Sequence, residues 1–197
     1  MKEFDPEDVE TRVTDRLVKT AVSPRPIAWV STTGENGVDN LAPFSSYNYV
    51  GSRQPIVTVH TSRREGGDLK DTARNAIDTG EFAVNVVTEA TLEPMDRTAE
   101  GLPPSESEFD FADVPRAECR TIDPPRVANA AVTMECTLHD SIEIYDRVML
   151  LGDVTYFHVA ESVTTDGEID ARKLDTVGRL GGPYYTVSEP MEFEREY

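Results

Sequence analysis

The chain has 197 residues, of which 37 are acidic and 19 basic, and its formal net charge is −18 at pH 7. The length suits one domain with a substantial core, and the charge argues against nucleic acid or anionic lipid as partners, because both bind to basic faces. The basic residues comprise 15 arginines and only 4 lysines. Many carboxylates with few lysines predict an acidic surface suited to a salt-rich, halophilic cytoplasm.

The N-terminal segment MKEFDPEDVE is acidic and lacks the apolar region typical of a secretion signal. No apolar run approaches the ~20 residues of a membrane span. Cys119 and Cys136 have neither the spacing of a disulfide framework nor that of zinc ligands. These patterns predict a cytoplasmic protein with reduced cysteines and no membrane association.

The first part of the chain is expected to form a hairpin after a lead-in. Residues 1–23 are expected to be partly extended. The segment 27–33 (IAWVSTT) has the aromatic and β-branched content of a strand. The turn signal GENG (34–37) then predicts a hairpin to a second strand from about Val38. The segment 56–62 (IVTVHTS) alternates as a strand does.

The middle of the chain combines helices with another strand. Asp68 is expected to be the N-cap of a helix that ends at Gly80. A strand is predicted at 82–87 (FAVNVV) and a short helix at 91–100. Residues 101–126 are rich in proline and acidic side chains without clear periodicity, so an ordered loop is expected there.

In the last part of the chain, the β-branched segments 131–144 and 147–160 predict a long hairpin with its turn at 145–146. The segment 170–185 is expected to be a short helix or turn before a Gly-Gly break. No repeat or linker divides residues 1–197, so we expect a single domain. The predicted fold class is mainly β with inserted helices, as a closed or partly closed antiparallel barrel.

Several common catalytic motifs are absent from the sequence. There is no GxGxxG after a strand, no phosphate-binding GxxxxGK[ST] loop and no GxSxG nucleophile motif. His60, His139 and His158 each fall in a strand pattern and lack ligand spacing, so core or barrel-lining positions are expected. No carboxylate pair stands out from the acidic surface. An enzyme built on this chain would therefore depend on a cofactor for its chemistry.

Three segments at predicted strand ends and a helix start carry groups that suit a phosphate, namely hydroxyls, backbone N–H groups and cations. They are NLAPFSS (40–46), TSRR (61–64) and DLKDT (68–72). Cations are scarce in this chain, yet three of them fall within the last two segments. The same residues would also suit an ordinary exposed loop with a helix cap, and the spacing alone leaves both interpretations open.

Taken together, SPRPIAWVST, NLAPFSSYN, KDTARNAIDTGEFAVNVV and GRLGGPYY resemble the flavin reductase-like family, over roughly residues 20–185. The fold of that family is the FMN-binding split barrel. The resemblance implies a homodimer that binds FMN noncovalently. It also implies an NAD(P)H-dependent flavin reductase, in which hydride passes from nicotinamide to flavin N5. A partner oxygenase or another electron acceptor is then expected.

Two other functions stay open from the sequence. Some members of the family are FMN-binding electron-transfer proteins without NAD(P)H activity. A split barrel without flavin could also serve as an interaction module. The ability to take up FMN separates the module from the other two, and reduction by NAD(P)H separates the reductase from the electron carrier.

The resemblance also assigns site residues. Cofactor-binding positions are Asn40, Ala42, Ser45, Ser46, Asn48, Thr61, Ser62, Arg63, Arg64, Lys70, Asp71 and Thr72. Lys70 is the expected phosphate cation, Arg63 and Arg64 are not ranked, and Asp71 has a helix cap as its other interpretation. No catalytic side chain and no metal are expected.

Further residues are placed by the same comparison of motifs. Arg179, Gly181 and Tyr184 match a segment on the nicotinamide side. Phe44 and Tyr47 are expected in the barrel or dimer core. The single tryptophan, Trp29, is expected in the core, with stacking on the flavin as the alternative.

Overall fold

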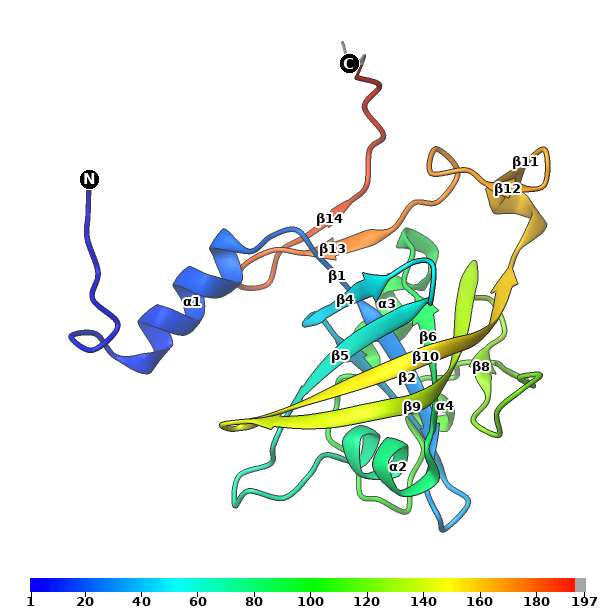
Figure 1. Cartoon of the computed structure of the whole chain (residues 1–197), viewed down its shortest axis with the longest axis horizontal. Helices are drawn as coiled ribbons and strands as arrows, with labels where there is room; N and C mark the ends of the chain where they lie inside the picture. The colour runs from blue at the N-terminus through cyan, green and yellow to red at the C-terminus, as the bar shows by residue number, and fades with distance from the viewer. Residues whose placement is uncertain (194–197) are drawn as a thin grey trace.

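A curved antiparallel sheet of seven strands dominates the computed structural model, which describes residues 1–193 (Figure 1). Its spatial order is β3-β2-β6-β9-β10-β5-β4. The strands are β2 (Ala28–Thr33), β3 (Asp39–Phe44), β4 (Tyr47–Gly51), β5 (Ile56–Ser62), β6 (Glu81–Val86), β9 (Val132–Ile144) and β10 (Arg147–Val159). The mainly β architecture is confirmed, and so are the predicted strands and the long hairpin.

The two edges of this sheet are joined by a very short stretch of chain. β3 forms one edge and β4 the other, and only Ser45 and Ser46 separate them in sequence. The sheet must therefore curl until its edges meet. At the junction the Ser46 carbonyl accepts a hydrogen bond from the His60 amide at 2.8 Å. The NLAPFSS segment thus lies where the barrel closes.

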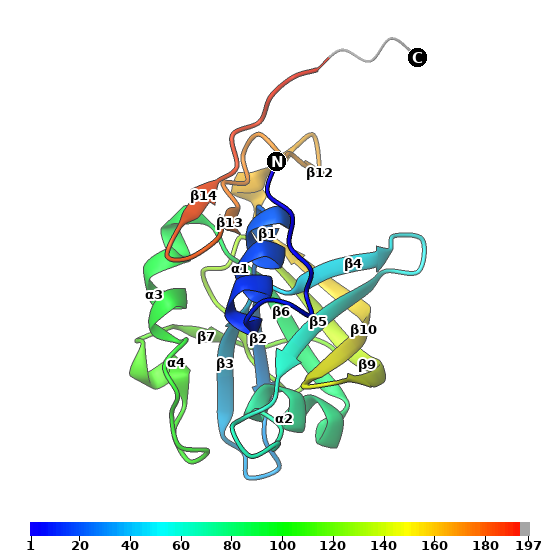
Figure 2. The ribbon, with the colours of Figure 1, turned by 90° about the vertical axis from the view of Figure 1, so that its left-hand side faces the viewer.

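Helix α2 (Asp71–Thr79) packs against β2, β3 and β6 and covers one end of the barrel (Figure 2). Its small residues Ala73 and Ala76 are fully buried there. The helix ends at Gly80, whose φ of 77° is the left-handed conformation that glycine adopts readily. The prediction that Asp68 is the N-cap is wrong, because the helix begins after Lys70, which holds the N-cap position.

The core forms on both faces of the sheet, which explains why β2 is apolar at successive positions. Ala28 and Val30 belong to a cluster inside the barrel, whereas Trp29 belongs to a cluster on the outer face. Trp29 is 1% exposed, so its core position is confirmed. Phe44 and Tyr47 pack against the inner cluster, as expected for barrel residues.

The segment after β6 covers the outer cluster (Figure 2). It contains η1 (Glu89–Thr91), α3 (Leu92–Arg97), α4 (Glu108–Phe111), β7 (Arg116–Ala117) and β8 (Arg126–Val127). The short helix predicted at 91–100 is confirmed. Residues 101–126 form an ordered excursion, which α4 anchors with the fully buried Phe109.

The N-terminal segment corrects one prediction. Residues 1–23 were expected to be a partly extended lead-in, but residues 11–21 form helix α1 (Thr11–Ala21). The signal lay in Val13, Leu17 and Ala21, which recur at spacing four on one helix face. None of the helix residues is buried, and α1 projects from the barrel in Figure 1.

The C-terminal segment pairs with the chain that follows α1. β1 (Arg25–Pro26), β13 (Val177–Arg179) and β14 (Tyr185–Val187) form a separate antiparallel sheet in the order β1-β13-β14. The segment 170–185 therefore forms a turn and two strands, and the helix considered for it is wrong. Between β10 and β13 lie η2 (Glu161–Val163), β11 (Thr164–Thr165) and β12 (Glu168–Ile169).

Both cysteines are free thiols, and burial raises the pKa of Cys119 to about 12. Each histidine lies on a strand of the large sheet, as predicted. The core or barrel-lining position expected for His139 is wrong, because its side chain is 53% exposed and pairs with Asp153 at the surface. Over residues 1–193, no helix combines the length and the apolar character needed to cross a membrane.

Candidate functional site

A cavity of about 480 Å³ lies beside the start of α2; we call it the α2 pocket. Its walls come from β3, from the first turn of α2, and from residues 98–102 and Glu108 of the covering segment. Six of the predicted cofactor-binding residues line it, namely Asn40, Ala42, Arg64, Lys70, Asp71 and Thr72. The fold thus gathers parts of all three segments that the sequence singled out.

The start of α2 presents free backbone donors to this pocket. The N-cap position is held by Lys70, which makes no side-chain capping bond, so the first-turn N–H groups keep no intrahelical or capping partner. These groups carry the positive end of the helix dipole. Lys70 is exposed, and within the described residues no carboxylate oxygen lies within 4 Å of its ammonium group.

The carboxylate of Asp71 is enclosed by two guanidinium groups. Arg64 pairs with one of its oxygens, and Arg74 approaches the other at 3.2 Å. Arg74 also donates to the Leu69 carbonyl at 3.1 Å. The two arginines offset the negative charge of Asp71, and Lys70 adds a positive charge to a wall that also contains Glu100 and Glu108.

A buried hydrogen bond ties β3 to α2. Asn40 Nδ2 donates to Thr72 Oγ1 at 2.9 Å, and the residues are 8% and 2% exposed. Burying an amide and a hydroxyl is tolerated because each is the partner of the other. The bond fixes the NLAPFSS strand against the first turn of the helix.

The covering segment contributes two residues that the sequence analysis missed. Glu108 is 7% exposed and accepts a hydrogen bond from the Leu41 amide at 2.9 Å. Burial raises the pKa of this carboxyl, which the backbone hydrogen bond opposes. Thr98 accepts a hydrogen bond from Trp29 Nε1 at 2.8 Å, so the tryptophan supports the pocket wall. One glutamate in an acidic loop and one threonine after a short helix gave no signal in the sequence.

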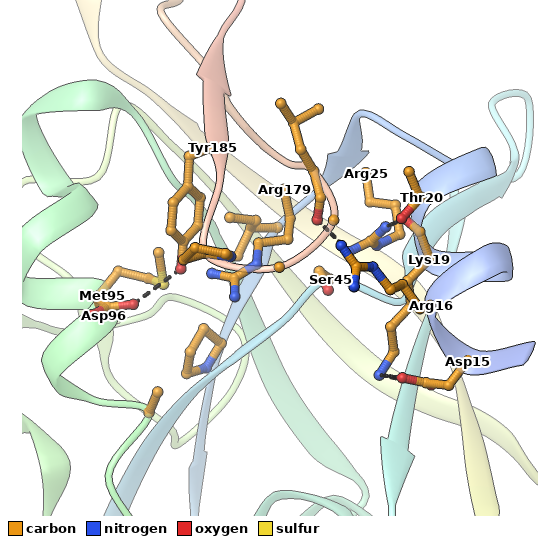
Figure 3. Close-up of a pocket in the computed structure, with 17 residues that line it drawn as sticks. Asp15, Arg16, Lys19, Thr20, Arg25, Ser45, Met95, Asp96, Arg179 and Tyr185 are labelled. Carbon is orange, nitrogen blue, oxygen red and sulfur yellow. Dashed lines mark hydrogen bonds and ion pairs between the residues drawn. The ribbon is translucent and has the colours of Figure 1, made fainter. Parts of the chain in front are cut away.

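A second cavity of about 700 Å³ adjoins the first; we call it the arginine pocket (Figure 3). The two cavities share Pro43 and Ala99 in their walls. Ser45, a predicted cofactor residue, lines the arginine pocket, and so do Arg179 and Gly181. Tyr184 is not at this wall: its side chain is 67% exposed, and the following Tyr185 occupies the lining position.

The other predicted cofactor residues lie outside both cavities. They are Ser46, Asn48, Thr61, Ser62 and Arg63. Asn48 is exposed on β4 and accepts from the Tyr49 amide at 2.9 Å. Thr61 is buried on β5, and its hydroxyl has no hydrogen-bond partner among the described residues. Arg63 lines neither cavity and instead pairs with Glu143 at 2.8 Å. Their role in cofactor binding stays a prediction.

Comparison with known sequences identifies the class of protein. The sequence model of the flavin reductase like domain matches residues 21–176, so the chain belongs to this family. An uncharacterized protein of Aquifex aeolicus is 37% identical over 171 residues, which cover 86% of this chain and 87% of the relative. Membership of this family supports the assignment of a flavin cofactor and an oxidoreductase activity to the protein.

Two solved structures define the resemblance more closely. Nitrilotriacetate monooxygenase component B from Bacillus cereus is similar with a TM-score of 0.92 and 35% identity, over 98% of both chains. A split-barrel protein from Shewanella frigidimarina has a TM-score of 0.85 at 21% identity, over 100% of both chains. The fold is therefore the split barrel of the flavin reductases, as the sequence motifs predicted.

Proposed function

We propose that the protein is an FMN-dependent oxidoreductase, with NAD(P)H as hydride donor and flavin as acceptor. The observation that carries the proposal is the α2 pocket, where an uncapped helix start, two cations and a buried hydroxyl face one cavity. The NLAPFSS segment runs from this cavity to a second one. A ligand with a phosphate at one end and a flat ring system at the other suits this pair of cavities.

The residues of the α2 pocket fit the phosphate of FMN. First-turn N–H groups and Thr72 supply hydrogen-bond donors, and Lys70 and Arg64 supply charge. Asp71 would orient Arg64 rather than contact the phosphate, because it is already paired with both Arg64 and Arg74. Of the two unranked arginines we therefore assign Arg64 to the cofactor.

The flavin ring would lie along the segment shared by the two cavities. Ala42 and Pro43 have small side chains, and Ser45 supplies a hydroxyl at the second cavity. FMN held by these residues would supply a hydride acceptor, its N5 atom, for the nicotinamide. The role of the protein is to bind and orient the two rings and to exclude water from them. No side-chain acid or base is assigned to this step.

We further propose a cytoplasmic homodimer that delivers electrons to a partner oxygenase or another acceptor. Helix α1 exposes Leu17 and Val18, at 41% and 62%, and buries none of its residues. The neighbouring Val22 is also 60% exposed. Such an apolar surface on a projecting helix favours cover by a second copy. Light scattering with bound flavin is expected to give the mass of a dimer, and a stable monomer would contradict this part of the proposal.

The activity is tested by recording flavin absorbance during anaerobic addition of NADH or NADPH. A reductase is expected to bind FMN and to bleach it rapidly with at least one of the two donors. Bound FMN that neither donor reduces, but that a chemical reductant does, would instead support the electron-transfer protein. Failure to take up FMN would overturn both functions and leave the interaction module.

A further inference from the structure

Glu108 is the one buried carboxylate in the wall of the α2 pocket, among the residues that the structure describes. Its exposure is 7%, whereas Asp71 is half-buried and Glu100 is exposed. Glu108 begins the short helix α4, which packs against β3 (Figure 2). This packing places an acidic side chain in the same wall as the cations of the proposed phosphate site.

The carboxyl group of Glu108 has a hydrogen-bond donor but no cation. Its Oε2 accepts from the Leu41 amide at 2.9 Å. Over residues 1–193, no nitrogen of a lysine, arginine or histidine side chain lies within 4 Å of the carboxyl oxygens. Burial of a carboxylate without a cation costs free energy, so this environment favours the neutral form.

The arginines of the surrounding elements are engaged by other acids. Arg64 and Arg74 both contact the carboxylate of Asp71. Arg116, whose guanidinium lies over the ring of Phe109, contacts two further carboxylates. These are Asp39 at 3.1 Å and Asp110 at 2.7 Å. The charge of an ionised Glu108 is therefore not offset by these groups.

A smaller cavity of about 180 Å³ adds negative charge around Glu108. It adjoins the α2 pocket and shares Asn40, Asp71 and Glu108 with it. The cation in its wall is Arg74, which is already paired with Asp71. The remaining carboxylates of this wall are exposed, and they are Glu35, Asp78 and Glu106.

Glu108 responds to charge at the start of α2. Burial raises the pKa of this carboxyl, hydrogen bonds from the backbone amides of Leu41 and Glu108 lower it, and the charge of Asp71 raises it again. Asp71 is the first residue of α2, where the phosphate of FMN is proposed to bind. A phosphate monoester carries about −1.5 to −2 charges at pH 7, so it would act on Glu108 in the same direction as Asp71.

We infer that FMN and a proton bind to the α2 pocket together, and that Glu108 is the residue that takes up the proton. The proton passes from solvent to the carboxylate, and no other covalent bond forms or breaks. Its charge cancels part of the negative charge that the phosphate brings into the cavity. Glu108 thereby makes the affinity for the cofactor depend on pH. The inference rests on the proposed function, because it requires the phosphate at the start of α2.

Proton uptake fixes the sign of the pH dependence. A carboxyl whose pKa is higher in the complex than in the free protein favours binding at low pH. The affinity for FMN then falls as the pH rises, by up to about tenfold per pH unit for one proton. The phosphate itself gives the opposite sign, because its second pKa is about 6 and a cationic site prefers the dianion. No histidine lines either cavity in the described part of the chain.

The test is fluorescence titration of the full-length, flavin-free protein with FMN and with riboflavin, between about pH 5.5 and 8.5 at constant ionic strength. Glu108→Gln keeps an oxygen for the Leu41 amide but cannot take up the proton. The FMN affinity of the native protein, relative to that of Glu108→Gln, should fall about tenfold or more across this range. Riboflavin lacks the phosphate, so the same ratio should hardly change for it.

Glu100→Gln is the matched control, because it removes an exposed carboxylate from the same wall and should keep the pH dependence of the native protein. Calorimetry of FMN binding in buffers of different ionisation enthalpy measures proton uptake by the native protein and needs no variant. No proton uptake, or the same pH dependence in native protein and Glu108→Gln, would overturn the inference alone. An equal pH dependence for riboflavin would also overturn it. Failure to take up FMN at every pH would overturn the proposed function as well.

Discussion

Arg64 forms an ion pair with Asp71, which lies in the first turn of α2. This contact turns the second arginine of TSRR toward the α2 pocket, while the first is directed to the long hairpin. Adjacent residues of identical chemistry thus have different surroundings.

The pair gives a prediction with its own control. Arg64→Ala removes one cation from the proposed phosphate site, so the affinity for FMN should fall about tenfold to a hundredfold. Arg63→Ala removes the same charge and side chain nearby, but its partner is Glu143, so the affinity should change less than about threefold. Fluorescence titration with FMN measures both. Equal losses in the two variants would show that only net charge matters here.

Lys70→Ala tests whether the phosphate lies at the start of α2. The ammonium group is exposed and has no carboxylate partner among the described residues, so the contact it would lose is to the ligand. FMN affinity should fall about tenfold to a hundredfold, and riboflavin affinity should hardly change because riboflavin lacks the phosphate. Paired titrations of the two flavins check this. Equal loss for both would instead mean that Lys70 supports the pocket as a whole.

The comparison of Arg63 with Arg64 also shows how far the sequence could lead. Motifs located the three segments, and strand patterns located the strands of the sheet, but not their spatial order. Which arginine faces the pocket depends on the register of β5 against β10, where Ser62 pairs with Arg147. Local sequence does not encode that register. Glu108 and the α1 cations Arg16 and Lys19 reach the two cavities only through tertiary packing, so no pattern could assign them.

Gly152 allows β10 to pack against the barrel core. A Cβ atom there would lie 2.3 Å from Cζ of Phe82, which is fully buried. Gly152→Ala should therefore destabilise the fold by about 1–3 kcal/mol through overpacking. Gly101→Ala is the control, because a Cβ atom at Gly101 meets nothing within 4 Å.

Urea unfolding of both glycine variants measures the effect. Adding Phe82→Leu to Gly152→Ala should recover part of the lost free energy, since the smaller ring-free side chain leaves room for the methyl group. If the double variant were less stable by the sum of the two single changes, the contact would not be the cause.

The acidic surface predicts a dependence on salt. At a net charge of −18, repulsion between carboxylates opposes the compact state. The screening length falls from about 30 Å at 0.01 M to about 3 Å at 1 M salt, so the melting temperature should rise over this range. Thermal melts in KCl check this, with sucrose as an uncharged control for general exclusion effects. A constant melting temperature would contradict the halophilic interpretation and leave the flavin proposal intact.

Glu135 carries a prediction about pH. Its side chain is fully buried on β9, where it accepts bonds of 2.6 Å from the amides of Arg120 and Thr121 and lies 2.5 Å from His158 Nε2. Burial opposes ionisation of this carboxyl, but the hydrogen bonds outweigh it and lower its pKa to about 2. The ionised form thus anchors the excursion to the barrel.

A lowered carboxyl pKa stabilises the fold above the unfolded-state value and loses that effect as the pH falls through the folded-state value. The ionised Glu135 should therefore contribute on the order of 3 kcal/mol at pH 7, and this contribution should decline from about pH 4.5 toward pH 2. Glu135→Gln should be markedly less stable than the native chain at pH 7, and the gap should narrow toward pH 3. Urea unfolding across this range measures the gap. The exposed Glu118→Gln serves as control, and a gap that is constant with pH would show that the carboxylate charge is not what holds the excursion.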